Sequence, residues 1–191
     1  MFALKKKYFL LIESIKDIDL RNIKKYNKYI IIYRHLKIKD NLAELIKFRK
    51  ECKLKLIEFY IANDIKLSVL LNSDGIYLSS YNKTFKALNL RGSNFNIIGS
   101  AHNIKEINLK IKQGCNYILL SKLFFVDYDK KSKFLGVVKF NKYLYTISNM
   151  LIPLGGIKIT NLNKLRNMNC KGFALMSEIK KKPANIINRL F

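Results

Sequence analysis

The residues best suited to hold an anion are a pair of glycines, Gly155-Gly156, and a serine, Ser177, near the end of the chain. Each follows a short apolar run, Leu151–Leu154 before the glycines and Gly172–Met176 before the serine. A glycine has no Cβ, so its backbone N–H can approach an anion closely, and a serine can cap a short helix whose first amides face the same anion. Either feature alone is as well explained by an ordinary turn or an ordinary cap. Both together, after consecutive apolar runs, favour a phosphate site.

Eight short apolar runs alternate along the chain with segments of helical periodicity, and we expect the runs to be strands. The runs are Tyr8–Ile12, Tyr29–Tyr33, Leu56–Ala62, Gly75–Leu78, Asn96–Ser100, Tyr117–Leu120, Leu151–Leu154 and Gly172–Met176. The clearest helical segments place residues three and four apart, at Leu42, Leu45, Ile46 and Arg49 and at Ile104, Ile107, Leu109 and Ile111. Unbroken apolar strands separated by helices of about 10–15 residues indicate parallel strands that are buried on both faces.

This alternation predicts an α/β fold, a single (β/α)8 TIM barrel that occupies residues 1–191. A doubly wound open sheet is the rival, but the segment Leu10–Ser14 offers none of the glycines of a GxGxxG turn. In a TIM barrel the active site lies at the C-terminal ends of the strands, and phosphate is bound after strands seven and eight. The positions of Gly155, Gly156 and Ser177 therefore agree with the predicted fold.

The composition excludes several classes of protein. Hydrophobic residues make up 49% of the chain, with 12 Phe and 11 Tyr, which excludes a disordered chain. The three cysteines, Cys52, Cys115 and Cys170, are far apart and lack a CxxC spacing, so neither a disulfide framework nor a zinc site is expected. The lysines before Tyr8–Ile12 resemble the start of a secretory signal, but that apolar run is too short for one. Without an apolar stretch of about 18 residues, no membrane partner is expected, and we predict a cytoplasmic location.

The formal net charge of +24 has two possible origins. A nucleic-acid-binding protein is expected to cluster its basic residues on one face, with arginines for base edges and aromatic residues for stacking. Here lysine is spread along the whole chain and arginine is scarce, while Lys, Ile and Asn are abundant together, as codons rich in adenine and thymine would produce. We expect no nucleic-acid partner, although steering of anionic substrates remains open.

Several segments carry a family resemblance in a fixed order. Ser73–Leu78 is similar to ADGVHLG, Ser100-Ala101-His102 to SAHS or SVHS, and Gly114–Ile118 to GADYIG. Further along, Gly155-Gly156-Ile157 is similar to GGI, and Asn169–Ile179 to GADGVAVVSAI. This ordered set resembles the thiamine phosphate synthase/TenI family of TIM barrels, and the resemblance covers nearly the whole chain beyond the second strand.

The resemblance implies thiamine phosphate synthesis, in which hydroxymethylpyrimidine diphosphate is joined to thiazole phosphate and pyrophosphate is released. The expected partners are these small phosphorylated substrates, and the oligomeric state is left open. The implied phosphate-binding residues are Ser100, Gly155, Gly156 and Ser177. The implied catalytic residues are Arg34, which matches the arginine of QxREK, Lys37, one place beyond its lysine, and Lys130, one place from the lysine of PTxTK.

The family's cofactor is Mg²⁺, and its implied ligands fall on amide and carboxylate side chains. Asn63-Asp64 resembles the family's ND pair, and the spacing back from Asp74-Gly75 places Asn63 at the metal position. Asn82 stands where the family's GQED ends in a carboxylate. An asparagine oxygen can ligate Mg²⁺, although it supplies no charge. Asn63, Asp64 and Asn82 are therefore the expected metal ligands.

Two alternatives follow from the same resemblance. A TenI-type thiazole tautomerase needs only the thiazole phosphate half of the site and an acid or base, and Lys122 stands where the pattern GHVFETDCKK has its histidine. A desolvated lysine can serve as a base, although Lys122 is as readily a phosphate contact. His102 is expected to orient its loop through hydrogen bonds. The non-enzymatic alternative is a binding protein for a thiazole or thiamine phosphate whose catalytic loops have decayed.

Overall fold

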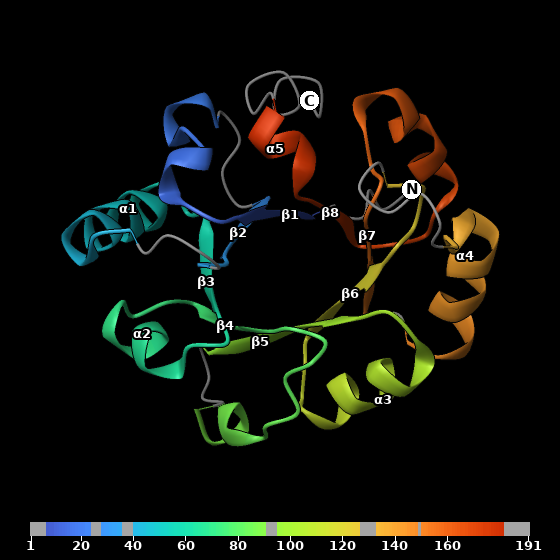
Figure 1. Cartoon of the computed structure of the whole chain (residues 1–191), viewed down its shortest axis with the longest axis horizontal. Helices are drawn as coiled ribbons and strands as arrows, with labels where there is room; N and C mark the ends of the chain where they lie inside the picture. The colour runs from blue at the N-terminus through green and yellow to red at the C-terminus, as the bar shows by residue number, and fades with distance from the viewer. Residues whose placement is uncertain are drawn as a thin grey trace.

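Eight parallel strands follow one another around a ring, and Figure 1 views the computed structural model with this ring open to the reader. The strands are β1 (Lys7–Ile12), β2 (Tyr29–Tyr33), β3 (Glu58–Ala62), β4 (Gly75–Leu78), β5 (Asn96–Ala101), β6 (Tyr117–Ser121), β7 (Leu151–Leu154) and β8 (Gly172–Leu175). The sheet runs from β8 through β1 to β7, and β7 lies beside β8, which completes the ring. The predicted (β/α)8 barrel is confirmed.

The structure describes residues 7–23, 28–35, 40–90, 95–126, 133–148 and 150–181. Two predicted catalytic residues, Lys37 and Lys130, lie outside these ranges. Within them, the longest α-helix has 13 residues, and none could cross a lipid bilayer.

Alternate side chains of each strand enter two separate hydrophobic clusters. Phe9, Leu11 and Ile30 belong to a cluster of strand residues that fills the interior of the barrel. Met176, just after β8, packs against this cluster. Leu10 and Ile31 belong to the cluster that also contains helix residues, so it lies between the sheet and the outer helices. Burial on both faces explains why the strands appear in the sequence as unbroken apolar runs.

The crossovers agree with the prediction only in part. The α-helices are α1 (Leu42–Leu54), α2 (Ile65–Leu70), α3 (Ile104–Lys112), α4 (Gly136–Thr146) and α5 (Ser177–Lys181). The other crossovers carry 3₁₀ segments in place of the expected helices: η1 (Ile15–Asp17), η2 (Leu20–Asn22), η3 (Lys86–Leu90) and η4 (Ile159–Asn167). Polar side chains at the start of η1 and η2 bond local backbone amides, Ser14 to Lys16 N and Asp19 to Arg21 N, and such caps favour short turns.

The helical periodicity located α1 and α3 correctly but assigned parts of their buried faces wrongly. In α1, Leu42 and Ile46 are 44% and 38% exposed, whereas Arg49 is buried. The Arg49 guanidinium forms two hydrogen bonds, of 2.9 and 3.0 Å, with the carboxylate of Asp74 at the start of β4. An ion pair thus occupies a position that an apolar pattern would give to a hydrophobic side chain. In α3, Lys110 is buried through hydrogen bonds to neutral groups, whereas Ile104 and Ile111 are 43% and 38% exposed.

Candidate active site

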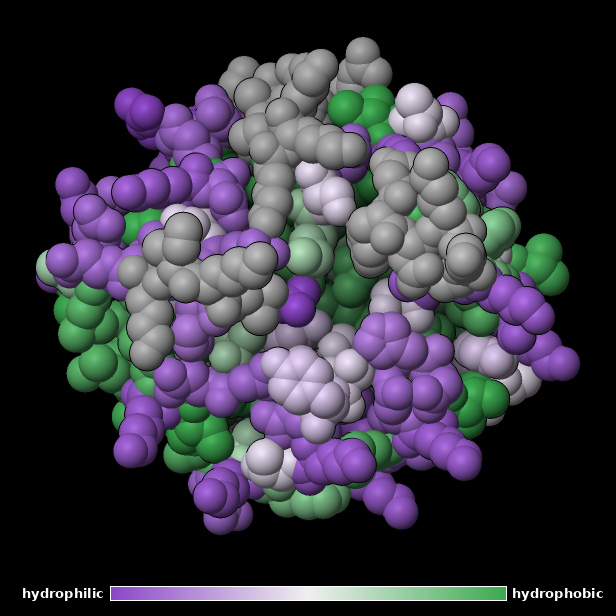
Figure 2. Space-filling view, in the orientation of Figure 1, coloured by the Kyte–Doolittle hydropathy of each residue, from purple (hydrophilic) through white to green (hydrophobic). Residues whose placement is uncertain are grey.

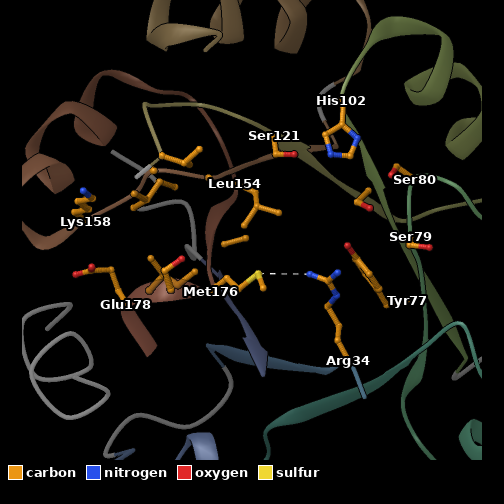
Figure 3. Close-up of a pocket in the computed structure, with 18 of the residues that line it drawn as sticks. Arg34, Tyr77, Ser79, Ser80, His102, Ser121, Leu154, Lys158, Met176 and Glu178 are labelled. Carbon is orange, nitrogen blue, oxygen red and sulfur yellow. Dashed lines mark hydrogen bonds between the residues drawn. The ribbon is translucent and has the colours of Figure 1, made fainter. Parts of the chain in front are cut away.

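A cavity of about 650 Å³ opens at the C-terminal ends of β4 to β8, and we call it the glycine pocket after Gly155 and Gly156, which line it. Figure 2 shows a hollow at the centre of this face of the molecule, with pale and hydrophobic residues on its floor and hydrophilic residues along part of its edge. In Figure 3, Arg34 and Tyr77 approach the pocket from one side, and His102 and Ser121 face them from the other. This is the end of the barrel where the sequence predicted the site.

The two glycines form a left-handed turn after β7, with φ of +91° at Gly155 and +70° at Gly156. A Cβ on Gly156 would lie 2.4 Å from the carbonyl oxygen of Phe125, and a Cβ on Gly155 would lie 3.2 Å from the Cα of Lys122. The Phe124 amide also donates to the Gly155 carbonyl at 3.0 Å. Glycine is therefore required to bring the loop after β7 against the loop after β6, and the same turn forms one wall of the pocket.

Two of the predicted phosphate contacts are serines in the lining of this pocket. Ser177 is exposed and is the first residue of α5, rather than the residue before the helix where a cap would stand. Ser100, at the end of β5, is buried and hydrogen-bonds the hydroxyl of Tyr77. The structure therefore brings Ser100, Gly155, Gly156 and Ser177 to a single cavity.

Arg34 reaches across the mouth of the barrel from the end of β2. Its guanidinium donates to the sulfur of Met176, just beyond β8, at 3.5 Å (Figure 3). Burial raises the pKa of the neighbouring Tyr77, and the charge of Arg34 and the hydrogen bond from Ser100 only partly oppose this effect. Tyr77 is therefore a neutral hydroxyl at physiological pH, beside a permanent positive charge.

His102 lines the glycine pocket from the start of α3. Its Nδ1 lies 3.1 Å from a carboxylate oxygen of Glu106, which also accepts from the His102 backbone amide at 2.8 Å. Asn103 donates to the other oxygen at 2.6 Å. Partial burial acts to raise the pKa of Glu106, but these hydrogen bonds outweigh it and leave the pKa below its ordinary value. The bond to the backbone is the orienting role predicted for His102.

A second cavity, of about 610 Å³, adjoins the first at the ends of β2 to β4. We call it the amide pocket after Asn63 and Asn82. It shares Arg34 and Tyr81 with the glycine pocket. Its lining carries the cations Arg34, Lys66 and Lys86 and, among the described residues, the single carboxylate Asp64. The two pockets thus meet at Arg34, and the second has an excess of positive charge.

The amide side chains in this pocket bond to one another and to the backbone. Asn63, at a φ of +57°, accepts through Oδ1 from the Ser79 amide and the Ser79 hydroxyl, both at 3.1 Å, and from Asn82 Nδ2 at 2.9 Å. Asn82 Oδ1 in turn accepts from the Thr84 amide at 3.0 Å. Asp64 caps α2 by accepting from the Leu67 amide at 2.9 Å. Each of the three predicted metal ligands therefore has a protein donor on its side-chain oxygen.

Lys110 on α3 was not predicted as part of the site. Its side chain is fully buried, and its ammonium donates to the carbonyl oxygens of Ser79 and Asn82, at 2.7 and 2.8 Å, and to Gln113 Oε1 at 2.9 Å. Gly99 makes room for the stem, because a Cβ there would lie 2.8 Å from Lys110 Cδ. The spacing of Lys110 and Gln113 on one helix face was the available signal, and the abundance of lysine in this chain concealed it.

Comparison with known proteins now places this barrel in a family. A family model described as thiamine monophosphate synthase matches residues 20–179. The chain belongs to the thiamine monophosphate synthase family. It is 29% identical over 174 residues to the thiamine-phosphate synthase of Prochlorococcus marinus strain AS9601, which covers 88% of this chain and 48% of the relative. The thiamine-phosphate synthase of Dictyoglomus turgidum is 27% identical over 175 residues, 88% of this chain and 78% of the relative.

The solved structures agree on the fold. Thiamine phosphate pyrophosphorylase from Pyrococcus furiosus superposes with a TM-score of 0.70 at 15% identity, over 96% of this chain and 98% of the other. The chain spans about half the length of the Prochlorococcus synthases that it matches, 48% of one and 40% of another. The predicted resemblance of this chain to the thiamine phosphate synthase family and the predicted barrel fold are both confirmed.

The Mg²⁺ that the synthase resemblance implies does not fit the residues of the amide pocket. Hard cations prefer several oxygen ligands and usually one or more carboxylates. Here the oxygens of Asn63 and Asn82 accept from the backbone and from each other, and Asp64 caps a helix. Across the described ranges, no group of three His, Cys, Asp or Glu residues is placed to hold a metal ion. We therefore derive no catalytic step through Mg²⁺.

Lys122, the predicted base of the tautomerase alternative, lies behind the glycine turn. Its Cα and Cβ are the atoms that a Cβ on Gly155 would meet first. Ser121, the residue before it, and Val126, four residues further on, line the glycine pocket, whereas Lys122 is not part of that lining. The residue at the position of the tautomerase histidine, Lys122, therefore does not line the cavity.

Proposed function

We propose that this chain is a thiamine phosphate synthase, which joins hydroxymethylpyrimidine diphosphate to thiazole phosphate and releases pyrophosphate. The observation that carries the proposal is the pair of adjoining cavities that share Arg34 and Tyr81. A reaction that joins two molecules requires two ligand sites in contact, whereas an isomerase that acts on one molecule requires only one. Membership of the synthase family supports the same conclusion.

In this proposal the glycine pocket holds thiazole phosphate. Gly155, Gly156 and Ser177 contact the phosphate at the ends of β7 and β8, where TIM barrels commonly bind phosphate. Leu154 and Val126 supply apolar surface for the thiazole ring. Ser100 bonds Tyr77 and so fixes a hydroxyl pair on the floor of the pocket beneath the ring.

The amide pocket then holds the pyrimidine diphosphate, with Arg34 between the two ligands. A bond forms between the thiazole ring nitrogen and the methylene carbon of the pyrimidine, and the bond from that carbon to the diphosphate oxygen breaks. The electron pair leaves with pyrophosphate, whose growing negative charge is stabilised by Arg34, Lys66 and Lys86. Lys37 and Lys130, outside the described residues, are proposed as further contacts to the diphosphate.

One observation favours a second candidate, the thiazole tautomerase. His102 lines the glycine pocket with its Nδ1 held by Glu106, an arrangement that leaves Nε2 to exchange a proton with a bound ligand. In that case His102, rather than the predicted Lys122, would be the acid and base. This candidate uses the glycine pocket alone and leaves the amide pocket without a role.

Release of pyrophosphate separates the two candidates. The wild-type protein is incubated with both substrates, and pyrophosphate and thiamine phosphate are quantified by enzyme-coupled assay and chromatography. The proposal predicts equal amounts of both products and a loss of at least about tenfold in rate for Arg34→Ala, because a charge-assisted contact to the leaving group is removed. Thiazole isomerisation without pyrophosphate, abolished in His102→Ala, would establish the tautomerase in its place.

A further inference from the structure

The loop after β4, residues 79–84, is fixed by a closed set of hydrogen bonds that we call the amide clasp, formed by Asn63, Ser79 and Asn82. The Ser79 backbone amide donates to Asn63, and the Thr84 backbone amide donates to Asn82. A backbone N–H can only donate, so each of these bonds identifies the side-chain atom that it reaches as the amide oxygen. The Nδ2 of Asn82 consequently points to Asn63 Oδ1, at 2.9 Å.

Presenting these oxygens to a cation would break the clasp. Rotation of the Asn82 amide would set its NH2 group against the Thr84 N–H, and Asn63 Oδ1 would lose a donor. Two donors that face each other repel, and a lost partner in a shielded site is costly. The clasp therefore holds two of the three predicted metal ligands, Asn63 and Asn82, in an orientation that is unsuited to a metal.

Lys110 on α3 bonds two backbone oxygens of the same loop. The carbonyl groups of Ser79 and Asn82 both accept from its buried ammonium, and Gln113 Nε2 donates to the carbonyls of Asn82 and Thr84 at 3.1 and 2.7 Å. Backbone carbonyls are the remaining ligands that a hard cation could use here. The loop is thus held to α3 by a fixed positive charge in place of a bound cation.

The rest of the pocket lining complements an anion. The lining carries the cations Arg34, Lys66 and Lys86. Among the described residues of the lining the only carboxylate is Asp64, which already caps α2. Phosphate oxygens bind guanidinium and ammonium groups directly, through short charge-assisted hydrogen bonds.

We propose that the amide pocket binds a diphosphate directly through side-chain cations, without a divalent metal ion, on a loop fixed by the amide clasp and Lys110. This inference rests on the proposed function for the identity of the ligand. It departs from the Mg²⁺ requirement that the family resemblance implies.

The test is calorimetric titration of inorganic pyrophosphate into the full chain, once in EDTA and once in MgCl₂. We expect similar affinities in both, and a loss of about tenfold or more for Lys86→Ala or Lys66→Ala. Lys47→Ala, which removes one exposed lysine from the outer helix α1, is the matched control and should bind as the wild type does. Binding that requires Mg²⁺ would overturn the inference and leave the synthase proposal intact. Failure to bind in either buffer would overturn both.

A second measurement probes the clasp without any phosphate. Mn²⁺, detected by electron paramagnetic resonance, should show no saturable site on the wild-type protein. The double variant Asn63→Asp/Asn82→Asp should gain one, because carboxylates then replace the amides; Asn82→Asp alone gives the same comparison if the double variant does not fold. A wild-type Mn²⁺ site that is lost in Asn82→Ala would contradict the inference, as would a folded aspartate variant that gains no Mn²⁺ binding.

Discussion

The glycine pocket and the amide pocket adjoin at one end of the barrel but are built in different ways. The glycine pocket is shaped by backbone, since the turn at Gly155-Gly156 packs against the loop after β6 and no other residue type fits Gly156. The amide pocket is shaped by side chains. Asn82 bonds Asn63, and Lys110 on α3 bonds the backbone of the loop that carries Asn82. A site made by backbone geometry keeps a recognisable sequence pattern, whereas a site made by side chains can change its chemistry while the fold stays the same.

The largest expected effect comes from adding a methyl group to the glycine turn. In Gly156→Ala the new Cβ would lie 2.4 Å from the Phe125 carbonyl at a φ of +70°, so the two loops must separate. We expect a loss of about 3 kcal/mol in the free energy of unfolding and loss of thiazole phosphate binding. Urea unfolding and calorimetry measure the two quantities.

Gly136→Ala is the matched control for this variant. Gly136 has a similar φ of +75°, but a Cβ there meets no atom within 4 Å. The control should lose only about 1 kcal/mol for the left-handed conformation and should bind ligand normally. Equal losses in the two variants would show that the contact with the loop after β6 contributes nothing.

The amide pocket is probed by Lys110→Met, which keeps most of the length of the side chain and removes its ammonium group. The carbonyls of Ser79 and Asn82 would each lose a buried donor, and we expect a loss of about 2 kcal/mol in the free energy of unfolding. Pyrophosphate affinity should fall more than thiazole phosphate affinity, because the residues proposed to hold the thiazole phosphate follow β7 and β8, although Ser79 of the held loop also lines the glycine pocket. Lys112→Met, on an exposed position of the same helix, controls for lost charge. An equal or larger fall in thiazole phosphate affinity would refute the separate roles of the two pockets.

The smallest expected effect is the pH dependence of stability that arises from Glu106, which bonds His102 beside the glycine pocket. The pKa of Glu106 is lowered in the folded protein, so its contribution to stability is complete above its ordinary pKa of 4.5 and is lost as the pH falls through the lowered value. We expect Glu106→Gln to cost about 1 kcal/mol at neutral pH. In thermal melts from pH 7 to pH 3, the difference between variant and wild type should shrink below pH 4.5. A constant difference across this range would assign the loss to packing alone.

The sequence predicted the backbone of this protein better than its side-chain contacts. Strands such as Tyr29–Tyr33 and Leu151–Leu154 appear at their predicted bounds because burial on both faces leaves an unbroken apolar run. Gly155 and Gly156 line the cavity at the end of β7, where their place after the seventh apolar run predicted them, and the structure adds that both have a positive φ.

Other features depend on partners that are distant in the chain. Arg49 is buried because its guanidinium pairs with Asp74. Lys110 is buried because its ammonium donates to two carbonyl oxygens of the loop after β4 and to Gln113 at the end of its own helix. Periodicity shows which positions face inward only when the inward residues are apolar, so it assigned Ile46 and Ile111 to buried faces where they are exposed. Asn82 likewise bonds Asn63, which follows another strand, and Lys110, which lies on α3.

The most direct test of the two-pocket account is a titration of thiazole phosphate into protein that is already saturated with pyrophosphate. The account predicts one site for each ligand, simultaneous occupancy with little change in affinity, and weakening of both in Arg34→Ala, because Arg34 lines both pockets. Displacement of pyrophosphate by thiazole phosphate would contradict the account, because it would show that the two ligands compete for a single site.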